Sequence, residues 1–86
     1  MNDSNGAFAE PVTVALPSGE VEVTSARQAA EMLLYHWPVG ETAKRIQARM
    51  ACMRVLGGTT APDVARSAFL GAALEADIVA ADSTTP

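Results

Sequence analysis

Two short segments near the start of the chain alternate apolar and polar positions. Residues 12–16 and residues 20–24 both follow this pattern, which is typical of a β-strand with one face in water. Pro17, Ser18 and Gly19 separate them. Proline pre-sets the φ angle of the second turn position, and glycine accepts the left-handed conformation that a three-residue hairpin loop requires. The pattern therefore predicts a β-hairpin with its valines facing the core.

The pattern then changes to a helical period. Ser25 and Gln28 have the spacing of a capping box at a helix start. Pro38 ends the helix at Trp37, because the residue before a proline is pushed out of helical geometry. At 100° per residue, the positions that share one arc and should face the core are Ala26, Ala29, Ala30, Leu33, Leu34 and Trp37.

A second helix should run from about Glu41 to Leu56, because Gly57-Gly58 provides a typical helix end. It carries two apolar stripes on roughly opposite sides. One consists of Ala43, Ile46, Met50 and Met53, and the other of Ala48, Ala51, Cys52 and Val55. Two apolar faces predict a helix that is covered on both sides and lies centrally in the domain.

The third predicted helix has Thr60 as its N-cap, Pro62 in its first turn and Asp63 at the third position. Its core stripe is Ala65, Ala68, Phe69, Ala72 and Ala76. Residues 78–80 are apolar, and whether they add a short strand to the hairpin is left open. The prediction is one α+β domain over residues 11–80, a β-hairpin followed by three helices, with flexible tails at residues 1–10 and 81–86.

This order of features resembles a family of small bacterial proteins, domain of unknown function 982 (DUF982), found mainly in rhizobia and related alphaproteobacteria. The resemblance covers about residues 11–80. The residues that carry it are Val12-Thr13-Val14, Gly19, Leu33-Leu34, Trp37-Pro38, Ala48, Cys52, Ala65-Arg66, Ala68-Phe69, Ala72-Ala73 and Glu75-Ala76. It implies a compact α+β domain and no activity. The loop after Trp37-Pro38 looks short, and Asp77 stands where similar proteins tend to have glycine.

Composition narrows the classes of function. The 86-residue chain has a net charge of −4, so it repels phosphate backbones on average, which argues against nucleic-acid binding. No apolar run approaches the roughly 20 residues that span a bilayer, and the first residues lack a signal-peptide pattern. The single cysteine forms no internal disulfide. We therefore expect a cytoplasmic protein without a membrane partner.

Candidate catalytic chemistry is sparse. His36 and Cys52 are the only residues of their types, and nucleophilic catalysis would need them within hydrogen-bond reach of each other. A half-exposed imidazole and a packed thiol are the expected environments. The sequence also lacks the ligands of a zinc site. We therefore predict no enzyme, no catalytic residues, no metal and no cofactor.

The remaining candidates are surfaces. Besides its core stripe, the third helix carries Ser67, Leu70, Gly71 and Leu74 at helical spacing, a ridge with small residues that another helix can approach closely. The leading hypothesis is a non-enzymatic interaction or regulatory module that forms a homodimer through this ridge, with Met32 and Tyr35 from the first helix. One alternative is a nucleic-acid binder that uses Arg45 and Arg49. The other is a small-ligand binder near Trp37, His36 and the methionine-lined second helix.

Overall fold

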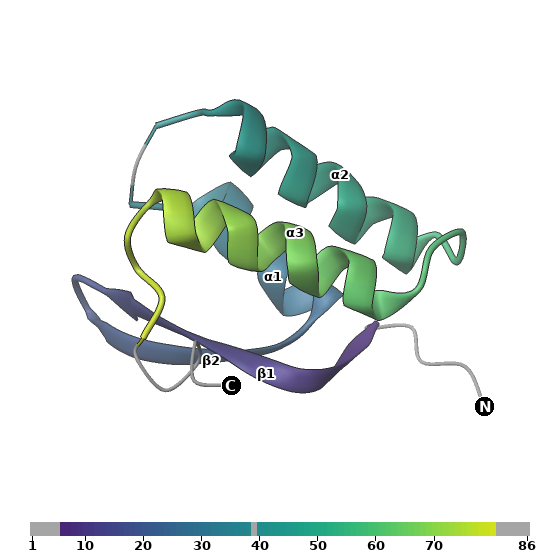
Figure 1. Cartoon of the computed structure of the whole chain (residues 1–86), viewed down its shortest axis with the longest axis horizontal. Helices are drawn as coiled ribbons and strands as arrows, with labels where there is room; N and C mark the ends of the chain where they lie inside the picture. The colour runs from purple at the N-terminus through teal and green to yellow at the C-terminus, as the bar shows by residue number, and fades with distance from the viewer. Residues whose placement is uncertain (1–5, 39, 81–86) are drawn as a thin grey trace.

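The computed structural model describes residues 6–38 and 40–80. The chain forms two strands and three helices, in the order β1 (Ala7–Leu16), β2 (Gly19–Ser25), α1 (Ala26–Tyr35), α2 (Ala43–Leu56) and α3 (Pro62–Glu75). The predicted α+β class and element order are therefore confirmed. In Figure 1 the hairpin forms one layer and α1 and α3 lie against it, while α2 packs on these two helices and lies farthest from the sheet.

The hairpin is antiparallel, and its register follows the predicted alternation. Val12 pairs with Val23, and Val14 pairs with Val21, so the valines share the face that the helices cover. Leu16 pairs with Gly19, so only Pro17 and Ser18 lie between the strands. The loop therefore has two residues, not the predicted three. Gly19 has a φ of 130°, which only glycine adopts readily.

Strand β1 begins earlier than the sequence suggested. Ala7 pairs with Ser25, and Phe8 is buried in the core. The register shifts between Ala7 and Val12, and this irregularity hid the start of the strand from an alternation argument. The predicted flexible tail is wrong for residues 7–10; residues 1–5 and 81–86 lie outside the described part of the chain.

Helix α1 has the predicted N-cap. The Ser25 hydroxyl oxygen accepts a hydrogen bond from the Gln28 backbone N–H at 3.1 Å. The helix ends at Tyr35 rather than Trp37, and the Trp37 ring instead packs edge-on against Phe69, with ring centroids 5.6 Å apart. Leu34 was expected in the core but is 48% exposed.

Helix α2 starts two residues later than predicted, because Thr42 is its N-cap and accepts a hydrogen bond from the Arg45 backbone N–H. It ends at Leu56, as predicted. The central position predicted for this helix is wrong. Its small residues and Val55 pack on α1 and α3, while the stripe of Ile46, Met50 and Met53 faces solvent.

Helix α3 begins without a side-chain cap. Ala61 occupies the N-cap position and Pro62 the first helical position, so the predicted cap at Thr60 is wrong and the predicted place of the proline is right. Pro62 has no N–H, so the first turn has one unpaired donor fewer, and the Val64 N–H bonds to the Ala61 carbonyl at 3.1 Å. Ala65 and Phe69 of the predicted core stripe are fully buried.

The chain turns back to the sheet after α3. Asp77 has a φ of 60°, a left-handed conformation, and the next residue, Ile78, donates its N–H to the Ala73 carbonyl. The segment 78–80 then runs along β1, where Val79 makes an isolated antiparallel bridge with Val14. Within residues 6–38 and 40–80 the segment 78–80 forms only this one bridge. It therefore does not form a third strand of the sheet.

Candidate functional site

The predicted ridge of α3 is only partly exposed. Ser67 and Leu74 are exposed, and Leu74 keeps 55% of its surface in water. Leu70 is half-buried and packs against the core. Apart from its chain neighbours and the backbone of its own helix, a Cβ atom added at Gly71 would meet no heavy atom within 4 Å, so the glycine leaves an open notch beside Leu74. The ridge therefore presents a projecting leucine next to a gap in the helix surface.

The two ridge partners predicted from α1 have different environments. Tyr35 is 75% exposed and is free to contact another molecule. Met32 is only 6% exposed, because it points between α1 and β2 into the protein's own core. The prediction that Met32 joins the α3 ridge in a dimer interface is wrong, because its side chain is covered by the chain's own sheet. Its position at the margin of the helical arc did not show that the sheet would cover it.

Helix α2 provides a second apolar surface that sequence reasoning had placed inside. Ile46, Met50 and Met53 follow one another at spacings of four and three residues, so they share one face of the helix. All three are exposed, with Met53 the most at 61%. The periodic pattern identified the stripe correctly, but helical periodicity alone does not reveal which of two apolar faces is covered.

The predicted basic edge of α2 is occupied by contacts within the chain. Arg45 donates from Nε (2.9 Å) and from its terminal nitrogen (2.6 Å) to the Leu33 carbonyl, one of the last carbonyl oxygens of α1 that lack a helical partner. Arg49 makes a bidentate ion pair with the Glu41 carboxylate at 2.7 and 2.9 Å. Both guanidinium groups therefore stabilise the α1–α2 connection.

The ion pair shifts the pKa values of both side chains in the direction that favours their charged forms. The hydrogen bond from Arg49 lowers the pKa of the Glu41 carboxyl below its ordinary value. The bond to Glu41 correspondingly raises the pKa of Arg49. The Arg49 guanidinium is already bound to the Glu41 carboxylate, so a polyanion would have to displace Glu41 to reach Arg49. This geometry disfavours the nucleic-acid alternative for these two residues.

Cys52 and His36 lie in the environments that the sequence suggested. Cys52 is fully buried on α2, and burial raises the pKa of its thiol to about 11, so the reactive thiolate is scarce at neutral pH. His36 is exposed at the C-cap of α1. No hydrogen bond joins the two side chains in the described structure. The arrangement gives Cys52 neither a base nor access to a substrate.

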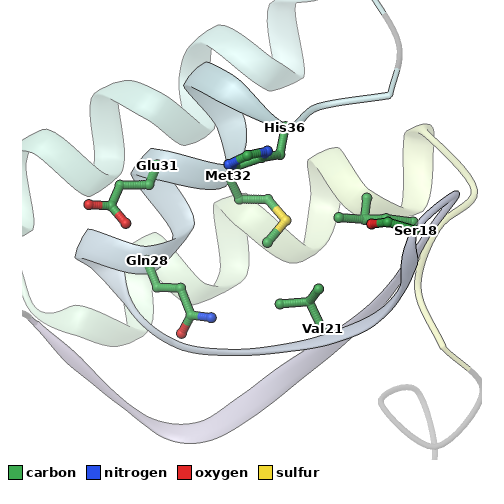
Figure 2. A pocket seen from close by; sticks show the side chains of 7 residues that line it. Ser18, Val21, Gln28, Glu31, Met32 and His36 are labelled. Carbon is green, nitrogen blue, oxygen red and sulfur yellow. The ribbon is translucent and has the colours of Figure 1, made fainter.

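A pocket of about 350 Å³ lies between α1 and the hairpin turn (Figure 2). Its apolar floor is formed by Leu16, Val21 and Met32, and polar side chains surround it: Ser18, Gln28, Glu31 and His36. Of the features predicted to surround a small-ligand site, only His36 lines this pocket; Trp37 and the methionines of α2 do not. Figure 2 shows Gln28 and Met32 reaching from α1 toward β2.

Residues 6–38 and 40–80 offer neither a metal site nor a membrane span. They contain no group of three or more histidine, cysteine, aspartate or glutamate side chains placed to hold a metal ion. None of their helices has both the length and the apolarity to cross a membrane.

A hairpin covered by two helices, with a third helix outside them, defines a small α+β domain whose notable features are surfaces rather than a reactive cluster. The sequence model of the family described as "Protein of unknown function (DUF982)" matches residues 10–80, and the chain belongs to this family. No curated protein and no solved structure matches the chain.

Proposed function

We propose that the protein is a small, non-enzymatic interaction module that self-associates through the outer face of α3. The observation that carries the proposal is the pairing of an exposed Leu74 with the open notch at Gly71. A glycine in a helix interior costs about 1 kcal/mol relative to alanine. Nothing inside the described chain requires that glycine, since a methyl group would fit. A close approach by a second helix provides a reason for it.

The ridge is also self-complementary under two-fold symmetry, the commonest symmetry of protein dimers. If two copies of α3 cross in antiparallel orientation near Gly71, then Leu74 of each copy lies opposite Ser67 of the other. A large side chain thus meets a small one at both ends of the contact. Tyr35 on α1 is a further exposed ring that a partner can cover.

The size of this face limits the strength of the dimer. Helix α3 has 14 residues, which corresponds to a length of about 21 Å. A contact one helix wide buries less than the roughly 800 Å² per partner of a standard interface. We therefore expect a reversible dimer with a dissociation constant in the micromolar range. A cytoplasmic location is part of the proposal and is supported by the single, buried, unpaired cysteine.

The test is the Leu74→Glu substitution. Leu74 occurs twice in a symmetric dimer, and each copy has about half of its side chain left to bury, which is worth about 1 kcal/mol per copy. Losing both copies should weaken association about 30-fold, before any cost of burying the new carboxylates. The measurement is molar mass by light scattering across a concentration series, starting from the chain mass of 8.9 kDa.

Two matched variants make the result specific. Leu34→Glu replaces a leucine of similar exposure on α1, and Met50→Glu changes the exposed stripe of α2. Both should leave the dimer intact if α3 is the interface. A wild-type protein that remains monomeric at high micromolar concentration refutes the proposal. A dimer lost in Met50→Glu and kept in Leu74→Glu moves the interface to α2.

A further inference from the structure

The outer edge of β2 is available for main-chain hydrogen bonding. Thr13 and Ala15 of β1 bond to the segment 78–80, so the alternate residues Val12 and Val14 bond to β2, where they pair with Val23 and Val21. The peptide groups of Glu20, Glu22 and Thr24 therefore point away from β1. In the described part of the chain the sheet ends at β2, because no strand pairs with it on that side.

The side-chain carboxamide of Gln28 is already bound at this edge. The Gln28 side chain donates from Nε2 to the Glu22 carbonyl at 2.8 Å and accepts at Oε1 from the Thr24 N–H at 2.9 Å. A carboxamide has the same donor and acceptor as a peptide group. These two bonds are the pair that the backbone of an added strand would make. The side chain thus occupies the place of a neighbouring strand.

The pocket beside α1 borders the same edge, because Gln28 both binds the outward groups of β2 and lines the pocket (Figure 2). Its floor of Val21, Met32 and Leu16 is apolar. Side chains of an added strand alternate in direction, so one of them can enter a pocket that lies between the strand and the helix. Recognition by strand addition commonly combines such main-chain bonds with a side-chain pocket.

Charge selects among possible occupants. Glu20 and Glu22 are exposed on β2, and Glu31 lies at the rim of the pocket, where its contact with Arg27 is long at 3.9 Å. A second copy of β2 would bring the same carboxylates together and be repelled. An extended peptide with lysine or arginine on either side of an apolar residue satisfies both the charges and the pocket.

We propose that the β2 edge and the adjoining pocket bind an extended, basic peptide segment of another protein, and that Gln28 holds the edge closed until the peptide displaces it. The surface consists of β2 and α1, so the proposal stands independently of self-association through α3.

The experiment uses a synthetic peptide, Lys-Val-Lys-Val-Lys with blocked ends, and the ¹⁵N-labelled full chain. Binding should shift the backbone amide resonances of Glu20 and Glu22 in a saturable manner and slow the hydrogen exchange of those amides. The Gln28→Ala variant keeps the backbone N–H that Ser25 caps. It should bind the peptide about three- to tenfold more tightly, since the two main-chain bonds of Gln28 and its bond from the Thr24 hydroxyl no longer have to be displaced. Gln47→Ala, which changes an exposed glutamine on α2, should bind like the wild type.

Two further peptides test the mode of binding. Replacing both valines by proline removes main-chain donors and should abolish the shifts. Replacing the lysines by glutamate should weaken binding through repulsion from Glu20 and Glu22. The proposal is overturned if the basic peptide leaves these amides unchanged, or if Gln28→Ala binds it no more tightly than the wild type. Self-association of Gln28→Ala through β2 without peptide also overturns it, because the edge would then accept a second copy.

Discussion

Replacing Gly71 by alanine should strengthen the fold and weaken self-association at the same time. Gly71 lies in the interior of α3, and the space where a Cβ would stand is empty. The substitution therefore gains about 1 kcal/mol of helix propensity without a clash. For a domain of this size, that gain corresponds to a rise of roughly 4–8 °C in the melting temperature of the monomer.

The same methyl group has the opposite effect on the proposed dimer. At the closest approach of two helices an added methyl overpacks the contact, which typically costs about 1–3 kcal/mol. The dissociation constant should then rise by a factor of about 5 to 150. Calorimetry at the lowest practical concentration measures the first effect, and sedimentation equilibrium measures the second. Gln47→Ala on α2 is the control for an alanine substitution elsewhere.

The prediction is specific because the same substitution should raise the melting temperature and weaken association. A variant that melts higher and associates as strongly as the wild type would show that no second chain lies over Gly71. A variant that melts lower when dilute would show that the space around Gly71 is not free in the monomer. Either result refutes the reasoning about the notch.

Three other outcomes follow from the structure. Asp77→Gly should stabilise the protein by about 1 kcal/mol in urea unfolding, because Asp77 has a φ of 60° and glycine takes that conformation without strain; an unchanged midpoint would contradict this. Burial raises the pKa of Cys52 from 9.0 to about 11, so the unfolded thiol ionises first and stability should fall as the pH rises from 9.0 toward 11. The fall attributable to the thiol, up to about 2 kcal/mol, should disappear in Cys52→Ala. Finally, each chain carries a net charge of −4, so raising NaCl from about 0.05 M to about 0.5 M should tighten the dimer, and weaker association in salt would argue for attraction between charges.

The features that the sequence predicted correctly are those governed by local geometry. Alternation placed Val12, Val14 and Val23 in the core, and a cap residue placed the start of α1 at Ser25. The buried positions of α3, such as Phe69, followed from helical spacing. Each of these depends on neighbours within a few residues along the chain.

Apart from misplaced element ends and the length of the hairpin loop, the errors concern contacts between distant parts of the chain. Phe8 is buried in the core, and the pattern of the residues around it in the sequence did not predict this. The two apolar stripes of α2 looked equivalent in sequence, and only the packing of three helices decides that Met50 and Met53 face water. Met32 was misassigned for the same reason. The edge role of Gln28 depends on Glu22 and Thr24 standing beside α1, so no motif could have indicated it.

The contact between two copies of α3 is tested most directly by isotope-filtered nuclear Overhauser spectroscopy on a mixture of labelled and unlabelled chains. We expect intermolecular signals from the Leu74 methyl groups of one copy to the protons of Ser67 and Gly71 of the other. A sample that has the mass of a dimer but shows no such signals, or shows them from Met50 and Met53 instead, would contradict it.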